Sequence, residues 1–548
     1  MPLQKNQVLT LQVERLSSDG SGVAHSPEGE AVFIPGAAPG DEARVRIVKD
    51  CKRYAFGILD EVLTPSPDRI PVDCAVAGPC GGCSLRHLDY TAELRAKQEN
   101  VADAFARIGG LDVPVLPIVG SPEIDRYRNK VQFPVGTDKA GRPCIGFYAG
   151  RTHRIVPCPD CRLQPGVLNE IGNTLCAFFA EKGIHPYNEE TGKGLVRHIF
   201  LRRGAHSGQI MVCLVCTRAK LPSAEELCTR LKEAFPDIVT ILLNVNAKNT
   251  NVILGSETHT LYGQGYIEDT LCGVPVQLGP LSFYQVNTLA AEQLYGIAAE
   301  YAQLTPDDLL LDLYCGMGTI GLSMADHCRE LVGVEIVPEA IESAKANAAR
   351  MGAAVSAKSR FFCADAGQAA AQLASEGLHP DVVMLDPPRK GCDEATLSAV
   401  VRMAPHRVVY VSCNPATAAR DAAWLEQNGY HAEKVQPVDL FPRTKHCEAV
   451  LLLTKLHVER HIEVDISMDE LDVTAAESKA TYDQIRYYVW EHYQLKVSNL
   501  YIAQVKQKHG IIERENYHKA KNENAKQPKC PKEKEDAIVE ALKHFQMI

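Results

Sequence analysis

The stretch LLLDLYCGMGTIGLSMA, residues 309–325, is the part of this sequence that decides its fold class. It reads as a buried apolar strand, a glycine turn and the start of a helix. The glycines stand at the spacing G-x-G-x-x-G, as Gly316, Gly318 and Gly321, and such a turn lets the backbone approach a ligand closely at a helix N-terminus. Glu335 ends the next apolar stretch, where a carboxylate can accept hydrogen bonds from both hydroxyls of a ribose. The pattern predicts a nucleotide-like cofactor on a Rossmann-like sheet, and it leaves open whether that cofactor is a dinucleotide or S-adenosylmethionine.

Strand-like and helical segments alternate from residue 280 to residue 455, which is typical of a doubly wound, largely parallel sheet. SFYQVNTLAAEQLYGIAAEYA, residues 282–302, reads as a strand end running into a helix. Ligands of such sheets bind outside the carboxyl ends of the strands, so the residues that follow each strand are the candidate site. The later strand segments are LVGVEI (331–336), DVVMLDPPR (381–389), RVVYVSCNP (407–415) and AVLLLTK (449–455).

Two further regions precede this Rossmann-like domain, so the expected fold is multidomain α/β. Residues 1–63 contain about five short strands, typical of a small OB-like β-barrel. Such barrels often bind oligonucleotides, although a purely structural β-module would have the same pattern. Residues 64–279 read as a central α+β domain with a cysteine-rich segment, an amphipathic helix at 90–108 and many short strands. From about residue 110 onward, little helix is expected before LPSAEELCTRLKEAF, residues 221–235.

Composition limits the class of protein. The chain has 548 residues and a formal net charge of −10, and this length is too great for a single core. No apolar run approaches the roughly 20 residues that span a bilayer, and the N-terminus lacks the apolar stretch of a signal peptide. We therefore expect a cytoplasmic, monomeric protein with no membrane partner. The 19 cysteines, an odd number, argue against a disulfide framework.

The choice of cofactor comes from the later strands. LDPPRKG, residues 385–391, places Asp386 at the tip of a strand, and the two prolines make a stiff loop beside the reactive end of the cofactor. Nucleic-acid methyltransferases commonly have an acid or amide followed by Pro-Pro at this place, which favours S-adenosylmethionine. Asp365 stands where the third strand should end, and it could face the adenine.

A candidate nucleophile follows the next strand. Most cysteines at strand ends are structural, but Pro415 stops this strand and presents the thiol of Cys413 at a turn. Addition of a thiolate to C6 of a uracil would make C5 nucleophilic enough to attack a sulfonium methyl group. The C5 proton must then be removed by a base, and Glu448 begins the last apolar strand. His446 beside it is more typical of a surface or loop-packing histidine.

Together these motifs resemble the bacterial 23S ribosomal RNA (uracil-C5)-methyltransferase family. The resemblance covers roughly residues 1–455. It implies that Gln285, Tyr314, Glu335 and Asp386 contact S-adenosylmethionine, that Cys413 is the nucleophile and that Glu448 is the base. It also implies that residues 1–63 are a TRAM domain, an RNA-binding module of the OB type. The matching segments are YRNKVQFPV (127–135), FYQVN (283–287), DLYCGMGTIGL (312–322), LDPPRKG (385–391), VSCNPAT (411–417) and PVDLFPRTKHCE (437–448).

Cys74, Cys80 and Cys83 stand as C-x5-C-x2-C, a spacing that indicates a metal site with one ligand missing. Cys158 and Cys161 are both candidates for the fourth ligand, and spacing alone favours neither, nor does it separate zinc from an iron–sulfur cluster. The family resemblance implies Cys161, eight residues beyond the histidine of an H-x-I-V element, and a [4Fe-4S] cluster. Methyl transfer needs no electron, so we expect the cluster to be structural or to orient RNA.

Residues 456–548 form an extension beyond the resemblance, with an acidic linker at 456–480 and then two helical segments. Residues 481–530 contain nine Lys or Arg against five Asp or Glu. Aromatic residues interleaved with basic ones can stack on RNA, but we expect the plainer alternative, a small helical appendage whose aromatic side chains form its own core. The aromatic residues are Tyr482, Tyr487, Tyr488, Trp490, Tyr493 and Tyr501.

The function expected from the sequence is methylation of uracil C5 in 23S ribosomal RNA. The same reaction on transfer RNA is the first alternative, and the cysteine cluster and the N-terminal barrel favour the ribosomal substrate. The second alternative is an iron–sulfur RNA-binding or ribosome-assembly protein whose methyltransferase domain is inactive. The presence of Cys413, Glu448 and the intact glycine turn at residues 316–318 argues against that second alternative.

Overall fold

The computed structural model describes residues 3–150, 152–248, 250–456, 482–493, 495–509, 530–545 and 547. The chain divides into two compact units, Met1–Val458 and Glu459–Ile548. Apart from Leu456, the predicted acidic linker at 456–480 lies outside the described residues. Among the described residues, no helix has the length and apolar character needed to cross a membrane.

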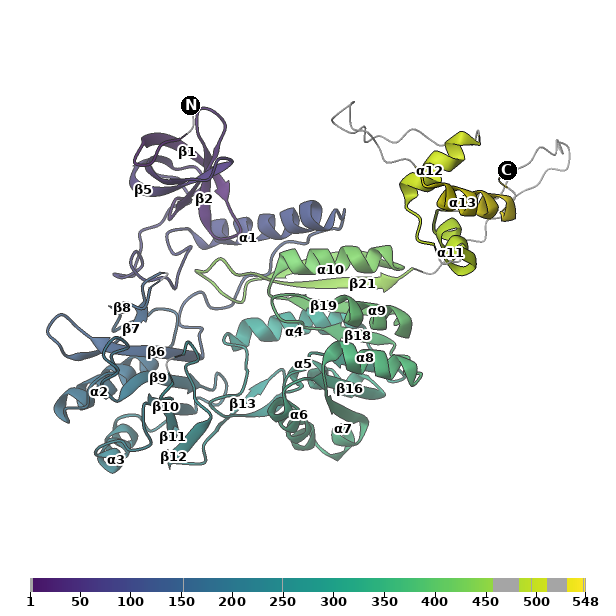
Figure 1. Cartoon of the computed structure of the whole chain (residues 1–548). Coiled ribbons are helices and arrows are strands. Elements are labelled where there is room, and N and C mark those ends of the chain that lie inside the picture. Colours follow the sequence, from purple (N-terminus) through teal and green to yellow (C-terminus); the bar gives the residue numbers. More distant parts are fainter. Residues whose placement is uncertain are drawn as a thin grey trace. The chain divides into compact units, whose positions relative to one another are not determined.

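The N-terminal region is the closed five-stranded barrel that the sequence predicts, with strand order β1-β2-β3-β5-β4 (Figure 1). Apolar and polar residues alternate along its strands, so that Val13, Val32 and Val45 fill the interior. The strands are β1 (Val8–Leu16), β2 (Ser21–His25), β3 (Ala31–Pro35), β4 (Glu42–Asp50) and β5 (Tyr54–Thr64).

The central region builds a seven-stranded sheet of order β12-β11-β10-β9-β6-β7-β8. Helices α2 (Gly166–Glu181) and α3 (Ala224–Ala234) pack on one face of it. The other face packs against a hairpin of β13 (Ile267–Leu271) and β14 (Val274–Leu278). The sheet strands are β6 (Lys130–Thr137), β7 (Pro143–Tyr148), β8 (Ile155–Pro157), β9 (Val196–Arg203), β10 (Ile210–Cys216), β11 (Ile238–Val245) and β12 (Glu257–Tyr262).

The expectation of little helix before residue 221 was wrong, because α2 is a 16-residue helix. Its buried residues include Leu168, Ile171, Leu175 and Phe178, which have helical spacing. The glycines of α2 lower its intrinsic helix propensity, and its N-terminus has no side-chain cap. The local sequence therefore gives only a weak indication that this helix forms. Gly172 is required by packing, since a Cβ there would lie 2.9 Å from Ile145.

The Rossmann-like sheet has the order β17-β16-β15-β18-β19-β21-β20, parallel except where β21 pairs antiparallel with both β19 and β20. This confirms the predicted doubly wound sheet. Its strands are β15 (Leu309–Leu313), β16 (Glu330–Glu335), β17 (Ser359–Cys363), β18 (Val382–Leu385), β19 (Arg407–Ser412), β20 (Tyr430–Val438) and β21 (Glu448–Lys455). The helices around it are α4 (Thr288–Ala302), α5 (Thr319–Ser323), α6 (Pro338–Met351), α7 (Ala353–Lys358), α8 (Ala366–Ser375), α9 (Glu394–Met403) and α10 (Pro415–Gln427).

One local prediction in this region was wrong. The segment 282–287 contains no strand and is an irregular loop that leads into α4. The Asn287 side chain caps α4 by accepting a hydrogen bond from the Ala290 N–H, so the helix itself begins as predicted.

The second unit contains three described helices, α11 (Tyr482–Tyr493), α12 (Asn499–Lys508) and α13 (Lys532–His544). The two predicted helical segments are confirmed, and α12 was not predicted. The buried core of this unit is aliphatic, with Ile485, Val489, Ile502 and Ile538 among its members. Tyr488 and Tyr501 pack against this core, whereas Tyr487, Trp490 and Tyr493 are exposed. The expected aromatic core is therefore only partly correct.

A buried ionic network joins the predicted helix at 90–108 to the loop before β21. This helix is α1 (Tyr90–Ala104), followed by one π-helical turn, Phe105–Gly109. The Lys97 Nζ donates to Glu93 Oε1 at 2.7 Å and to Asp439 Oδ1 at 2.8 Å. All three side chains are at most 1% exposed. The Arg443 N–H also donates to Glu93, at 2.7 Å, so α1 holds the loop at residues 439–443 from two sides.

Replacement of Lys97 by methionine is expected to destabilise the protein by about 3–5 kcal/mol, because it leaves the buried Asp439 without its cation and leaves Glu93 with only the more distant Arg443, at 3.7 Å. Urea-induced unfolding measures the change. Lys345→Met is the matched control, since Lys345 pairs with Glu342 at the surface and such pairs contribute about 0–1 kcal/mol. Equal losses in both variants would contradict a structural role for the buried network.

Candidate active site

Six of the predicted site residues lie at one edge of the Rossmann-like sheet. Five of them end or follow the parallel strands β15 to β19, namely Tyr314, Glu335, Asp365, Asp386 and Cys413. Strand β21 runs antiparallel to β19, with Ala449 opposite Ser412, so its first residue, Glu448, reaches the same edge. Side chains separated by more than 130 residues in the sequence are therefore neighbours here.

Three residues, Gly316, Gly321 and Tyr314, determine the conformation of the glycine turn. Gly316 has a φ of +55° and no atom within 4 Å of the place where a Cβ would lie, so its backbone is open to a ligand. Gly321 is required by packing, since a Cβ there would lie 2.8 Å from Asp312 Oδ2. The Gly321 N–H donates to that oxygen at 3.0 Å. Tyr314 has a φ of +65°, a costly conformation for a side chain of its size that is typical of functional sites.

Glu335 is oriented by the glycine turn. The Gly316 N–H donates to Glu335 Oε2 at 3.2 Å, and the Ile336 N–H donates to Oε1 at 2.8 Å. The apolar side chain of Ile336 is 62% exposed beside this carboxylate. A flat apolar ligand such as a nucleobase would cover it, and the carboxylate would face the attached ribose.

Asp365 has a structural role that the sequence analysis did not anticipate. Its Oδ1 accepts hydrogen bonds from the Gly367 and Gln368 N–H groups and caps α8. A cap of this kind fixes the carboxyl at the end of β17, where the sequence analysis placed it.

Cys413 is held in a turn that is tied to the neighbouring Pro-Pro loop. The Asn414 Nδ2 donates to the Arg389 carbonyl at 3.0 Å, and Pro415 begins α10 directly after it. Burial, together with the negative charges of Glu448 and Asp386 and against the effect of Arg389, raises the pKa of the Cys413 thiol to about 11. The thiol is therefore protonated at neutral pH, and it must lose its proton as it attacks.

Two carboxyls beside the thiol are unusually basic. Burial raises the pKa of Glu448 to about 8, with Asp386 adding to the rise and Arg389 opposing it. Burial also raises the pKa of Asp386 to about 7. A base whose pKa lies near the working pH is suited to proton removal, and Glu448 has this property. His446 is half-buried, its pKa is lowered by burial, and its ring packs edge-on against Phe441.

Gln285 lies apart from the strand ends, in the loop before α4, and the central domain holds this loop in place. The Asn129 Nδ2 donates to the Gln285 carbonyl at 2.7 Å, and the Asn129 N–H donates to the Val286 carbonyl at 2.8 Å. The buried Arg202 guanidinium donates to the carbonyls of Gly279 and Ser282. Asn129 was noted only as part of a motif and Arg202 was not noted, because both act through backbone atoms distant in sequence.

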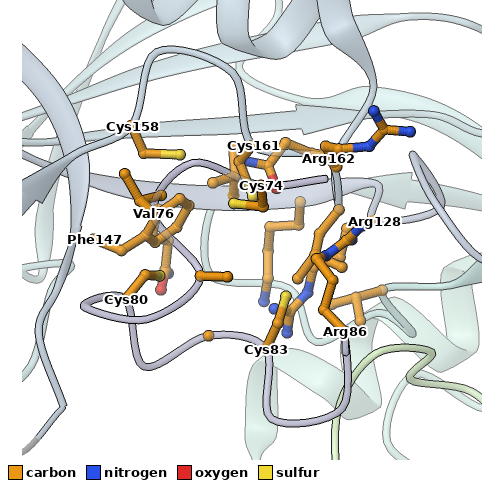
Figure 2. Close-up of a pocket in the computed structure, with 18 residues that line it drawn as sticks. Cys74, Val76, Cys80, Cys83, Arg86, Arg128, Phe147, Cys158, Cys161 and Arg162 are labelled. Atoms are coloured by element: carbon orange, nitrogen blue, oxygen red, sulfur yellow. The ribbon is translucent and has the colours of Figure 1, made fainter. Parts of the chain in front are cut away.

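The predicted cysteine ligands line one cavity of about 220 Å³ in the central region (Figure 2). The cavity wall includes both candidates for the fourth ligand, and Figure 2 shows them on one loop, across the cavity from Cys80. A hydrogen bond from Cys158 lowers the pKa of Cys161, against the effect of burial. Among the described residues, no three His, Cys, Asp or Glu side chains converge closely enough to hold a metal ion. The cavity cysteines are Cys74, Cys80, Cys83, Cys158 and Cys161.

Glu448→Gln is expected to raise the melting temperature of the cofactor-free protein, and by more at pH 8 than at pH 5. The folded-state pKa of about 8 lies above the ordinary value of 4.5, so the unfolded chain releases a proton and stability falls as the pH rises between these values. Glutamine does not ionise and avoids this loss, which is about 1.4 kcal/mol per pH unit. Calorimetry at the two pH values measures it, with the exposed Glu376→Gln as control. A gain that is the same at pH 5 and pH 8 would refute the raised pKa.

Comparison with known proteins agrees with this arrangement. The family model of TRAM domains matches residues 2–59, and that of tRNA (Uracil-5-)-methyltransferases matches residues 276–456. An uncharacterized RNA methyltransferase of Halalkalibacterium halodurans is 44% identical over 453 residues, which cover 82% of this chain and 98% of that relative. Another from Bacillus cereus is 41% identical over 456 residues, which cover 83% of this chain and 98% of that relative.

A solved structure has the same fold over most of this chain. It is the Pyrococcus abyssi tRNA (uracil-54, C5)-methyltransferase in complex with S-adenosyl-L-homocysteine. The match has a TM-score of 0.65 and 27% sequence identity, and it covers 82% of this chain and 100% of that one. It supports S-adenosylmethionine over a dinucleotide as the cofactor of this fold. This chain belongs to the family of RNA (uracil-5-)-methyltransferases that have an N-terminal TRAM domain.

Proposed function

We propose that this protein methylates C5 of a uracil in 23S ribosomal RNA, with Cys413 as covalent nucleophile and Glu448 as base. The observation that carries the proposal is the meeting of one thiol and two carboxyls, all with raised pKa values, at a single strand edge. Burying such groups together costs stability, and a protein that only bound RNA would have no use for them.

The cofactor would lie across the glycine turn. S-adenosylmethionine supplies an electrophilic methyl group on a sulfonium centre. Glu335 would accept the ribose hydroxyls, and the open backbone at Gly316 would let the cofactor approach. Asp386 would place a carboxylate near the positive sulfonium, which would restore its ordinary ionisation. The other residues proposed to contact the cofactor are Gln285, Tyr314 and Asp365.

The residues of this chain would act in sequence on the uracil. The Cys413 thiol releases its proton to water as its sulfur adds to C6, and the C5=C6 electron pair moves to make an enolate that ends at O4. C5 then takes the methyl group. Glu448 removes the C5 proton, the C5=C6 double bond re-forms, and the Cys413 sulfur leaves C6 as thiolate. The raised pKa of Glu448 makes it a stronger base for this step than an exposed carboxylate.

The resemblance of residues 1–455 to the bacterial 23S ribosomal RNA enzymes supports ribosomal RNA as substrate. Transfer RNA is the second candidate, because the Pyrococcus abyssi structure is that of a tRNA enzyme. On the barrel surface, Phe33, Tyr54 and Phe56 form a cluster with ring centroids 5.7–5.9 Å apart. Tyr54 is 41% exposed, and such a cluster on an OB-type barrel suits base stacking.

Mass spectrometry of 23S ribosomal RNA and transfer RNA, isolated from cells with and without this protein, tests the substrate. The 5-methyluridine content of the 23S RNA is expected to rise with the intact protein and to stay at background with Cys413→Ala. Cys447→Ala is a control thiol, since Cys447 lies one residue before Glu448 but is fully packed. A rise confined to transfer RNA would overturn the ribosomal assignment, and methylation by Cys413→Ala would overturn the nucleophile.

Glu448→Gln is expected to accumulate a covalent protein–RNA complex, because the C5 proton stays in place and Cys413 cannot be eliminated. A denaturing gel of protein incubated with RNA and S-adenosylmethionine would show the complex as a slowly migrating band. The double variant Cys413→Ala/Glu448→Gln should show none. Full turnover by Glu448→Gln would exclude Glu448 as the base.

We further propose a [4Fe-4S] cluster held by Cys74, Cys80, Cys83 and Cys161. Four thiols on the wall of one cavity suit a cluster, in which each iron takes one thiolate, better than one zinc ion, whose four sulfurs must all lie about 2.3 Å from a single point. Lining residues Arg86, Arg128, Lys130 and Arg162 would balance the negative charge of the thiolates.

Protein purified without oxygen is expected to be brown, with about four iron atoms and four sulfides per chain. Cys161→Ser should lose most of the iron, whereas Cys158→Ser should retain it. Iron analysis and the visible absorption spectrum measure both. Colourless protein that contains zinc would refute the cluster, and the reverse order of the two variants would make Cys158 the fourth ligand.

A further inference from the structure

The second unit has no assigned role. It begins where the family resemblance and the tRNA (Uracil-5-)-methyltransferase match end, at residues 455 and 456. The Halalkalibacterium halodurans relative is matched over 98% of its length by 453 residues of this chain, so this unit is additional to that relative. It has its own core, which is separate from the cores of the first unit.

Helix α11 presents three aromatic rings that the core does not use. Tyr487, Trp490 and Tyr493 are 66%, 45% and 43% exposed. Their spacing of three residues places them along one side of the helix. Every exposed large apolar side chain in the described part of this unit is one of these three. A group of large aromatic side chains exposed to solvent normally indicates a binding site.

A positive charge lies beside the middle ring, Trp490, and the exposed Glu491 follows that ring in the helix. Lys496 lies with its Nζ 5.6 Å from the centroid of Trp490, and among the described residues no carboxylate is within 4.0 Å of it. The exposed His492 ring stacks on Tyr488, with centroids 4.1 Å apart. Residues 481–530 as a whole contain nine Lys or Arg against five Asp or Glu.

We propose that this α11 face, made of Tyr487, Trp490, Tyr493 and Lys496, binds single-stranded RNA by base stacking. Exposed aromatic rings offer flat surfaces for bases, and Lys496, which has no carboxylate within 4.0 Å among the described residues, suits a phosphate. Tyr and Trp are also common at protein interfaces, so the excess of Lys and Arg in residues 481–530 is what favours RNA as the occupant. This inference rests on the proposed function, since RNA binding by the α11 face would serve an enzyme that acts on RNA. The binding itself does not require methyl transfer.

The chain contains two tryptophans, so Trp490 can report directly on its own surroundings. Trp424 packs against the core of the Rossmann-like domain and would be replaced in a Trp424→Phe full-length protein. Titration with an oligouridylate of about 12 nucleotides is expected to quench the emission of the remaining Trp490 by stacking. Unchanged Trp490 emission at saturating RNA would overturn the proposal.

Affinity gives a second readout. Tyr487→Ala/Tyr493→Ala removes two exposed rings without touching the core, and it is expected to weaken binding of the same oligouridylate on the order of tenfold or more. The exposed Gln507→Ala on α12 is the control and should bind as the parent does. Equal affinity of all three proteins would also overturn the proposal and would leave another protein as the occupant of this face.

Both measurements are made in a Cys413→Ala background, so they do not depend on methyl transfer. Quenching of the Trp490 emission, combined with no methylation by the enzyme that retains Cys413, would refute the proposed function and still support RNA binding by the α11 face. Methylation of ribosomal RNA with no response at Trp490 would do the opposite. In the active enzyme, the double aromatic variant should raise the KM for long RNA and leave kcat unchanged.

Discussion

The buried ionic contact of Lys97 with Asp439 and Glu93 is the constraint on which the arrangement of this protein most depends. It joins a helix near residue 97 to a loop near residue 439, and Arg443, 3.7 Å from Glu93, adds a second positive charge to the two carboxyls. Its geometry has to be satisfied fully, because a buried carboxyl without its cation is costly. The loop that it fixes leads directly to Glu448, so the position of the proposed base follows from packing far outside the site.

Burial of ionisable side chains also accounts for the chemistry proposed at the strand edge of the Rossmann-like sheet. Burial raises the pKa values of Cys413, Glu448 and Asp386, so the cofactor-free site carries less charge than its side chains suggest. A positive sulfonium beside Asp386 would reverse part of that effect.

The central domain contributes to the site without supplying a reacting group. Asn129 and Arg202 hold the loop at residues 279–287, which contains Gln285, through backbone carbonyls. The face of the central sheet opposite α2 and α3 packs against the hairpin β13–β14 and α4, so the two regions share one core. A rigid connection of this kind would keep the barrel and the cysteine-lined cavity in register with the catalytic edge.

The amino-acid sequence by itself determined the fold class, the strand edge that carries the ligands and the residue types available there. It did so because strand periodicity, glycine spacing and the residue after each strand are local signals. Only the tertiary structure decided that α2 forms despite its glycines, that residues 282–287 are a loop, and that Tyr487, Trp490 and Tyr493 face solvent. It also decided the pKa values and the contact of Lys97 with Asp439. These depend on which groups, hundreds of residues apart, exclude water from one another, and no spacing along the chain encodes that.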